Sequence, residues 1–469
     1  MSKFNHTNSI LTINAAGAPA YKQDNYDAFV KQLLCMMVNE PKYYGDNTNS
    51  FIEFVNEMID TDPKFVAQSA VFARTVGNMR SVSHLVCAIL SNRVKGQPYI
   101  RKAIRHCIVR GDDVTEMLAA YIYLFGKPIP NSLRRGLRDA MEYFSPYTLA
   151  KYRGYGKEVS MADAVKICHP NFINPESQEA ANLLVRTELK RPISWETDLA
   201  KYSNNCDTWE RLIQEDKVPY MAMLRNLRNI QDAGVDEATF NLVKDKLTNI
   251  DAIKKSKQFP YRYQSALSCL DDALYRDIVI AALNKSVENF PKLKGKTAIF
   301  VDVSGSMMWK DAAKIAALYA AVIHATCKDE VYIIQYSYDA QKVVMSKYDS
   351  VYTNSQTFKF EWGGTNMASA FWYLIDTSID VNRIINLTDN EANSQVRPMQ
   401  FILDKYRAKV GHDVWCHMWD LAGNDKTTQV IGKHTNYLSG FSDKMFQYIT
   451  LTESGVTSII EDIKKINLM

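Results

Sequence analysis

The sequence predicts a protein of two parts, a long array of short α-helices followed by a doubly wound α/β domain. Three observations lead to this prediction. Apolar residues recur at spacings of three and four through residues 26–290, and no stretch with the period of a strand interrupts them. Apolar β-branched runs then alternate with helical runs, which is typical of a sheet with parallel strands. With 469 residues, the chain is also too long for one ordinary hydrophobic core.

Residues 1–25 are polar, and we expect them to form an extended lead-in. Helical periodicity begins at Tyr26, and short helices joined by polar residues follow. The expected helices span residues 26–41, 49–60, 62–75, 82–93, 98–109, 113–125, 131–144, 146–153, 161–168, 175–186, 193–201, 206–215, 219–233, 236–248, 251–256, 261–271 and 273–288. None of them can bury its apolar face alone, and no strict sequence period is present. The pattern therefore predicts a degenerate HEAT-like array, an α-solenoid.

Residues 291–469 change to alternating strands and helices after the polar stretch Lys292–Gly295. The expected strands span residues 297–303, 331–337, 341–345, 383–387 and 413–418, and the expected helices span residues 310–326, 367–377, 396–408 and 443–450. This order predicts a doubly wound α/β domain. In such a domain ligands bind at the carboxyl ends of the strands, near a topological switch point.

Oxygen-bearing side chains follow two of these strands. The first strand runs into D-V-S-G-S, where Asp302, Ser304 and Ser306 are spaced by two residues. Thr365 follows a Gly-Gly turn, and Asp389 ends a later apolar strand. Carboxylate and hydroxyl oxygens suit a hard divalent cation, so the sequence predicts a site for Mg²⁺, with Mn²⁺ as the alternative. These five residues resemble the metal-ion-dependent adhesion site of the von Willebrand factor A domain, D-x-S-x-S, then a Thr, then an Asp.

The composition, 46% apolar and 23% charged, is that of a folded soluble protein. No uncharged apolar run reaches the length of a membrane span, and the first residues lack the core of a signal peptide, so we expect a cytoplasmic protein without a membrane part. Eight cysteines are scattered without a C-x-x-C pair, which favours reduced, mostly buried thiols.

The charge is distributed unevenly along the chain. Residues 296–469 hold 17 Lys and Arg against 19 Asp and Glu, which leaves 39 against 33 of the totals of 56 and 52 for residues 1–295. Within 93–110 there are six Lys and Arg and no carboxylate, and Arg101, Lys102 and Arg105 fall on one helical face. Basic residues and tyrosines are interleaved through residue 157. Such a mixture suits phosphates and unpaired bases, although a solvated helix face is the alternative.

The helical array followed by an A-like domain resembles the TROVE family, and most closely its Ro ring proteins. The resemblance is carried by P-N-S-L-R-R-G-L at 130–137, by K-Y-R at 151–153 with S-M-A-D-A-V-K-I-C-H-P at 160–170, and by M-L-R-N-L at 223–227. It also rests on V-D-V-S-G-S-M, G-G-T-N and T-D-N-E in the second part.

The resemblance implies a monomeric ring closed by the A domain. Small structured noncoding RNAs of the Y type would bind the outer face, and single-stranded ends of misfolded RNAs would enter the central hole. It implies outer-face RNA contacts at Lys151, Arg153 and His169, with Arg101, Lys102 and Arg105 added on charge density alone. An exoribonuclease or another protein could bind at the A domain, and the role implied is quality control of noncoding RNA.

No motif predicts an enzyme. Gly295-Lys296-Thr297 imitates the end of a phosphate-binding loop, but Phe290 stands where that motif needs a glycine, and a strand follows where it needs a helix. The chain has no H-E-x-x-H motif. The alternative to an RNA-binding ring is therefore a metal-dependent adaptor that binds protein partners through the A domain.

Overall fold

The computed structural model describes residues 11–13, 19–22, 25–35, 48–309, 312–360, 363–394, 399–422, 426–427, 434–440, 444–455 and 459–469. Parts of four expected elements lie outside these residues: 36–41 of the first helix, 310–311, 396–398 and 443. Most of the expected lead-in lies outside them as well. No described helix has the length and the hydropathy that a membrane span requires.

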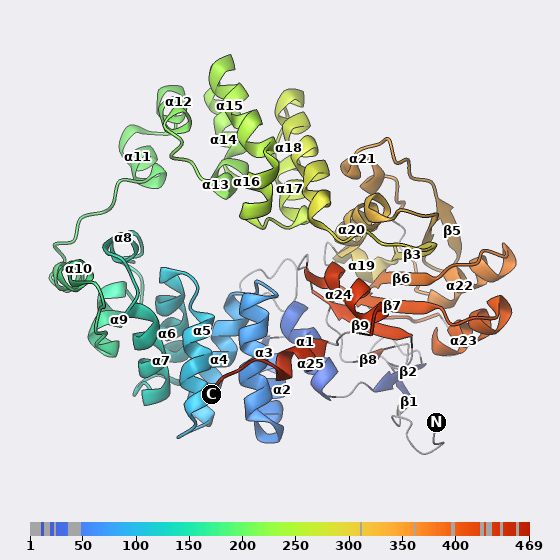
Figure 1. The fold of residues 1–469 in the computed structure, drawn as a ribbon, viewed down its shortest axis with the longest axis horizontal. Helices are drawn as coiled ribbons and strands as arrows, with labels where there is room; N and C mark the ends of the chain where they lie inside the picture. The colour runs from blue at the N-terminus through green and yellow to red at the C-terminus, as the bar shows by residue number, and fades with distance from the viewer. Residues whose placement is uncertain are drawn as a thin grey trace. The chain divides into compact units, whose positions relative to one another are not determined.

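The chain forms two compact units. One, the helical unit, consists of residues 25–193 and 457–469, and the other, the mixed unit, consists of residues 1–24 and 194–456. The change from helices to strands falls near the expected boundary at residues 290 and 291. The two compact units, in contrast, divide the chain after residues 24, 193 and 456. Figure 1 traces both units along the chain.

The helical unit is built from short helices, and side-chain caps mark the start of several of them. Its helices are α1 (Asn25–Cys35), α2 (Thr48–Thr61), α3 (Pro63–Thr75), α4 (Ser81–Arg93), α5 (Pro98–Cys107), α6 (Gly111–Phe125), α7 (Asn131–Met141), α8 (Pro146–Lys151), α9 (Met161–Cys168), α10 (Pro175–Val185) and α25 (Ile459–Lys464). Asp62 caps α3, where Pro63 takes the first helical position, and Ser160 and Asp163 form a capping box at the start of α9.

Helices of the helical unit pack against near neighbours in the chain. Contacts join α3 to α4 and α5, α4 to α6, and α5 to α7. Packing of α7 on α5 is close because Gly136 has no side chain: a Cβ there would lie 2.7 Å from Ile104. These contacts confirm a helical array in which each helix buries its apolar face against the next ones.

The mixed unit begins with a second set of helices. They are α11 (Trp195–Tyr202), α12 (Cys206–Gln214), α13 (Tyr220–Arg225), α14 (Leu227–Ala233), α15 (Glu237–Thr248), α16 (Ile250–Ser256), α17 (Pro260–Leu267), α18 (Ala273–Ser286) and the 3-10 turn η1 (Val287–Asn289). The single helix expected over 219–233 is wrong, because the chain bends at Asn226 and forms α13 and α14. The Asn226 side chain donates to the carbonyl of Ala222, 2.8 Å away, and so competes with the helical ladder.

A six-stranded sheet forms the centre of the α/β part. Its strands lie in the order β5 (Ala340–Val343), β4 (Val331–Tyr336), β3 (Thr297–Asp302), β6 (Arg383–Thr388), β7 (Trp415–Asp420) and β9 (Thr435–Ser439). All neighbours are parallel except β5, which pairs antiparallel with β4. From β3 the chain adds β4 and β5 on one side of the sheet, and it then returns to add β6, β7 and β9 on the other side of β3. The switch point therefore lies between β3 and β6. This is the doubly wound sheet that the sequence predicts.

Helices cover both faces of the sheet, as Figure 1 shows for α20 and α24 on one side and α22 and α23 on the other. These helices are α20 (Ala312–Thr326), α22 (Met367–Asp376), α23 (Met399–Val410) and α24 (Lys444–Glu453), and two short ones are α19 (Gly305–Trp309) and α21 (Val351–Ser355). Phe300 packs against Phe371 of α22, whereas Tyr319 of α20 contacts Trp419 on the opposite face. Coverage of both faces explains why β3 is buried along its whole length.

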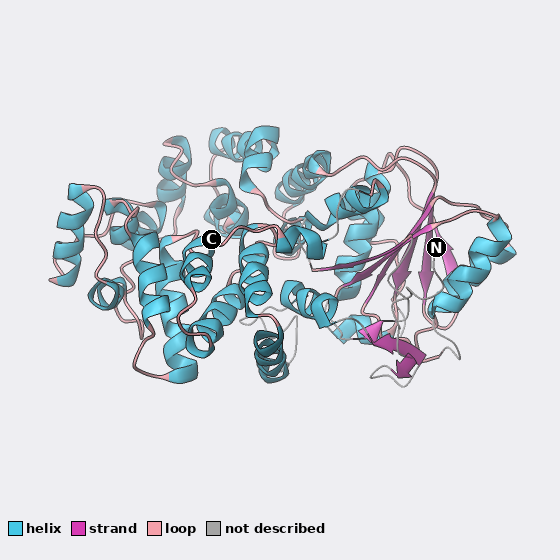
Figure 2. Ribbon diagram, turned by 60° about the horizontal axis from the view of Figure 1, so that its bottom comes forward, coloured by secondary structure: helices cyan, strands magenta, loops and turns pink. Residues whose placement is uncertain are grey.

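A small second sheet accompanies the large one, as Figure 2 shows. It pairs β1 (Leu11–Ile13) with β2 (Pro19–Lys22), and β2 with β8 (Lys426–Thr427), all antiparallel. The lead-in is thus extended where it is described. The eight cysteines are free, and six of them are buried.

Candidate functional site

The carboxyl ends of β3 and β6 bring the predicted metal ligands to one edge of the sheet. Asp302 is the last residue of β3, and Asp389 directly follows β6. Both side chains are buried, with 0% and 1% of their surface exposed. They are close enough that the charge of Asp389 acts on Asp302. The parallel pairing of β3 and β6 therefore brings these two carboxylates to the same edge of the sheet, as the sequence predicts.

The turn after β3 collects the two predicted hydroxyls. The amide of Ser304 donates to Asp302 Oδ1 at 3.0 Å, which closes the turn on the carboxylate. Ser304 Oγ lies 3.2 Å from Ser306 Oγ. The D-x-S-x-S pattern thus gathers three oxygen-bearing side chains within one turn.

The loop that carries Thr365 lies against both strand ends. The amide of Thr365 donates to Asn393 Oδ1 at 2.7 Å, and the amide of Gly305 donates to the carbonyl of Gly363 at 3.2 Å. Gly364 permits this approach, because a Cβ there would lie 2.4 Å from Ser394 Oγ. The end of β3 and three loops, which together contain all five predicted ligands, therefore converge at this edge.

The polar groups at this edge fit a divalent cation. Burial and the nearby charge of Asp389 raise the pKa of Asp302 to about 7, since two carboxylates there repel one another. Thr365 Oγ1 is buried and has no hydrogen-bond partner among the described residues. A hard cation would offset the paired negative charge and accept the Thr365 oxygen as a ligand, and the donors are carboxylates and hydroxyls only.

Three residues that the sequence reasoning missed also shape this edge. Thr388 Oγ1 donates to Asp302 Oδ2 at 2.7 Å, and Asn393 holds the Thr365 amide. Asp420 ends β7 beside Thr388 and is fully buried. The signal for Asp420 was present, since W-C-H-M-W-D ends an apolar strand in an acid as R-I-I-N-L-T-D does. Thr388 and Asn393 carry no comparable signal, because their roles depend on contacts across strands and loops.

The predicted RNA contacts after α7 lie on the surface of the helical unit. Lys151 Nζ stands 5.9 Å from the ring centres of Tyr147 and Tyr152. His169 is exposed and caps α9 in the left-handed conformation, with φ of 50°. Arg153 lies 4.7 Å from the ring of Tyr155 and donates to the carbonyl of Leu189, so it also holds the local fold together.

The earlier basic stretch is partly neutralised by carboxylates that sequence spacing does not reveal. Arg101 forms two hydrogen bonds with Asp139, at 2.5 and 2.8 Å, and Arg93 pairs with Asp60. Lys102 and Arg105 are exposed, and Arg105 lies 5.2 Å from the ring centre of Tyr143. Of the three residues expected on charge density, Lys102 and Arg105 therefore present their charge to solvent, whereas Arg101 is engaged within the fold.

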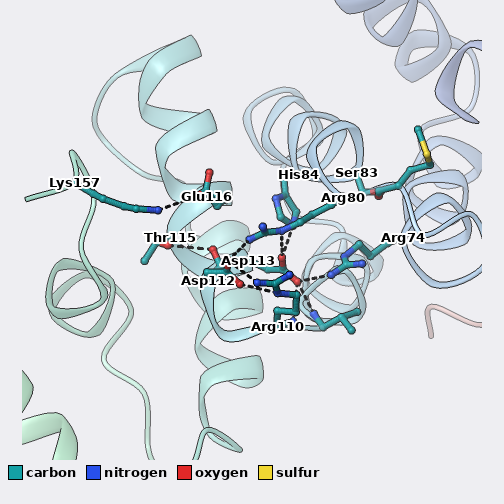
Figure 3. Close-up of polar contacts among 12 residues, drawn as sticks. Arg74, Arg80, Ser83, His84, Arg110, Asp112, Asp113, Thr115, Glu116 and Lys157 are labelled. Carbon is teal, nitrogen blue, oxygen red and sulfur yellow. Dashed lines mark hydrogen bonds and ion pairs between the residues drawn. The ribbon is translucent and has the colours of Figure 1, made fainter. Parts of the chain in front are cut away.

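Asp113 binds two further arginines of the helical unit, Arg74 and Arg80, as Figure 3 shows. This fully buried carboxylate binds Arg74 at 2.8 Å and Arg80 at 2.6 Å, and it accepts hydrogen bonds from the amides of Val109 and Arg110. Burial alone would raise the pKa of Asp113, but His84, Arg74 and the Arg110 amide lower it to about 2. Burial lowers the pKa of His84 to about 4, so at neutral pH the two arginines supply the positive charge. The cluster holds α3, α4 and α6 together.

The fold and these two sites define a helical-repeat protein that carries an α/β domain. The family model described as the TROVE domain matches residues 27–185 and 185–348, which is more than half of the chain. The chain therefore belongs to the TROVE family.

Two curated relatives and one solved structure extend this comparison. The chain is 36% identical over 97 residues to the telomerase protein component 1 of Mus musculus and 40% identical over 86 residues to that of Rattus norvegicus. These matches cover 21% and 18% of this chain, but only 4% and 3% of the relatives. The Ro (RSR) protein of Deinococcus radiodurans superposes with a TM-score of 0.67 over 92% of this chain and 100% of that chain, at 18% identity. At that identity the likeness concerns the fold.

Proposed function

We propose that this chain is a Ro-like RNA-binding protein that acts by binding rather than by catalysis. The observation that carries the proposal is the alternation of cations and exposed tyrosines on the surface of the helical unit. Tyr143 and Tyr147 are 63% and 51% exposed, and Arg105 and Lys151 lie over their rings. Cations neutralise phosphates, and exposed rings stack on unpaired bases, so the two together suit RNA.

The finer proposal follows the resemblance to the Ro ring proteins. A small structured Y-like RNA would bind the outer helical face at Lys151, Arg153 and His169, and Lys102 and Arg105 would extend this surface. Single-stranded ends of misfolded RNA would enter a central hole of a monomeric ring. Family membership and the Ro-like fold support this proposal, and quality control of noncoding RNA is the role it implies.

A combined variant, Lys151→Gln with His169→Asn, tests the RNA surface. Asparagine tolerates the left-handed backbone at residue 169 better than most residues, so the helix end is retained while the ring is lost. Affinity for structured RNA should fall about tenfold, and the slope of log affinity against log salt should become shallower by about one.

The matched control is Lys244→Gln, which removes an exposed lysine from α15 in the mixed unit. Arg153→Lys is a third variant. It keeps the positive charge but removes the guanidinium that donates to the Leu189 carbonyl. Equal RNA affinity of the combined variant and the wild type would contradict the assignment.

We also propose that the α/β part is a von Willebrand factor A-like domain whose Asp302, Ser304, Ser306, Thr365 and Asp389 bind Mg²⁺. A carboxylate from an exoribonuclease or another protein would complete the ion's shell. The buried Thr365 hydroxyl, for which the described part of the chain offers no hydrogen-bond partner, favours this second function. If the A-like domain acts as a protein adaptor, Asp302→Asn should abolish partner capture and leave RNA affinity unchanged.

A further inference from the structure

A pocket of about 770 Å³ opens at the amino edge of the six-stranded sheet, opposite the edge that holds Asp302 and Asp389. Its walls come from the segments that precede β3, β4 and β6, from the last turn of α20 and from the loop after β5. The volume falls within the range of sites for small molecules. Neither the metal site nor the RNA surface uses these residues.

Hydrogen bonds fix the wall of the pocket that precedes β3. The amide of Gly295 donates to Asp329 Oδ2 at 2.5 Å, and the amide of Lys296 donates to Asn382 Oδ1 at 2.8 Å. Gly295 has φ of +90°, and a Cβ there would lie 2.9 Å from Asn382 Oδ1. Glycine is therefore required both by the backbone conformation and by the close approach. The wall is a defined structure rather than a loose loop.

Three lysines give the pocket its charge. Lys296 is paired, because its ammonium lies 3.1 Å from Glu330. Lys328 and Lys347 also line the pocket, and neither forms an ion pair with any residue in the described ranges. Two ammonium groups are thus left to face an anion. Asp329 and Glu330 are exposed beside them, and both carboxylates have partners, because Asp329 accepts from the Gly295 amide and Glu330 pairs with Lys296.

His324 supplies a buried polar group at the same place. It lines the pocket with 6% of its surface exposed, and its Nδ1 has no hydrogen-bond partner among the residues that the structure describes. Burial and the charge of Lys347 lower the pKa of His324, so the imidazole is neutral at pH 7. In the tautomer that carries its proton on Nδ1, the neutral imidazole has a buried donor without a partner among the described residues, which is costly unless a ligand accepts from it.

We propose that this pocket binds a small phosphorylated molecule, with phosphate oxygens held between Lys328 and Lys347 and a hydrogen bond to His324. Of the described residues that line the pocket, only Val331 and Met345 carry large apolar side chains, and none is Phe, Tyr or Trp. A nucleobase would find no ring of that kind to stack on. Recognition therefore rests on the phosphate groups, and the site is independent of the RNA surface.

Titration calorimetry of the full chain with inorganic pyrophosphate tests this site. Wild-type protein should bind one pyrophosphate per chain in a saturable isotherm. The double variant Lys328→Gln/Lys347→Gln should weaken binding on the order of tenfold or more, since it removes both unpaired cations. His324→Phe should weaken binding by about threefold, and its thermal midpoint would verify that it folds.

The control is Lys342→Gln, which removes an exposed lysine from β5 of the same sheet, outside the pocket. Absence of saturable binding to the wild type would overturn the proposal, as would an equal loss in Lys342→Gln, which would indicate diffuse attraction. Competition between single-stranded RNA and pyrophosphate, with loss of RNA affinity in the double variant, would assign the pocket to RNA and also overturn it. The variants at Lys151 and His169 should bind pyrophosphate as the wild type does.

Discussion

Single residues decide the chemistry of both ends of the large sheet. At the carboxyl edge, the Ser304 amide donates to Asp302 Oδ1 and the Thr388 hydroxyl donates to Asp302 Oδ2, so the carboxylate is held in one orientation. At the amino edge, Gly295 and Asn382 set a wall that a side chain would disrupt. Both edges are thus organised in part by groups that are not themselves expected ligands, such as Thr388 and Asn382.

The first prediction concerns Mg²⁺. Adding the ion at about 100 times its dissociation constant should stabilise the wild type by about 2.7 kcal/mol, and Asp302→Asn should lose this effect. In EDTA, wild-type stability should fall as pH rises from the ordinary value of 3.8 toward about 7, because folded Asp302 must lose its proton beside Asp389. Mg²⁺ should flatten that fall. Thermal midpoints between pH 5 and 8 measure both effects.

The exposed variant Asp376→Asn, at the end of α22, is the control for the loss of a carboxylate. A Mg²⁺ response that survives in Asp302→Asn would contradict the site.

The second prediction concerns Asp113. Asp113→Asn leaves Arg74 and Arg80 without their buried counter-charge and should cost about 3–5 kcal/mol. The wild type should also lose stability in acid. His84, whose folded pKa is depressed, contributes to the loss between pH 6.5 and about 4, and Asp113 contributes between pH 3.8 and about 2. Urea midpoints against pH would reveal both steps.

Asp112→Asn gives the comparison, since Asp112 pairs with Arg80 and Arg110 from a partly exposed position. It should cost less than about 1 kcal/mol. A midpoint of Asp113→Asn equal to that of Asp112→Asn would refute the central role of Asp113.

At the scale of elements, the sequence predicts most helices and strands, because periodicity and caps are local signals. It misses the break at Asn226, since Leu224, Leu227 and Ile230 keep helical spacing across it. It also misses β9, a short strand whose place is set by parallel pairing with β7. The convergence of the five predicted metal ligands could be predicted because each of them ends or follows a recognisable strand or Gly turn. The pocket could not, because its walls come from five separate segments.

The third prediction concerns packing of α7 on α5. Gly136→Ala would place a Cβ 2.7 Å from Ile104 and 2.8 Å from the Arg101 carbonyl. Overpacking of this kind costs about 1–3 kcal/mol, and the higher helix propensity of alanine returns at most about 1 kcal/mol. Thermal unfolding should therefore show a net loss.

Arg135→Ala, an exposed change on the same helix, should stay within about 0.5 kcal/mol of the wild type. A stabilised Gly136→Ala would indicate that the helices separate without cost.

At the scale of the whole molecule, the last residues belong to the helical unit rather than to the α/β part that precedes them. Helix α25 packs on α3, and Gln68 Nε2 donates to the carbonyls of Lys464 and Ile466 at 2.9 and 2.8 Å. Ile463 and Leu468 are buried, with 0% and 1% exposed. The sequence predicts one domain over residues 291–469. It does not reveal that the last residues pack on α3, because contacts between residues almost 400 positions apart leave no local signal.

The fourth prediction follows from this packing. Deleting residues 459–469 should uncover apolar surface on α3 and remove both acceptors of Gln68. Amide hydrogen exchange in α3 and α4 should become at least about tenfold faster, whereas exchange in β3 and β6 should stay unchanged. Deleting only the exposed Met469 should have no effect. Unchanged protection of α3 after the longer deletion would contradict the assignment.

The same segment affects the order in which the chain can fold during translation. The polypeptide passes between the two units after residues 24, 193 and 456. Residues 25–193 of the helical unit are made before the mixed-unit residues 194–456, whereas the residues that cover α3 are made after them. Until then, α3 lacks the packing of α25, in which Ile463 is buried. The nascent chain therefore exposes apolar surface on α3 while the mixed unit is being made. A chaperone would bind the nascent chain at this surface.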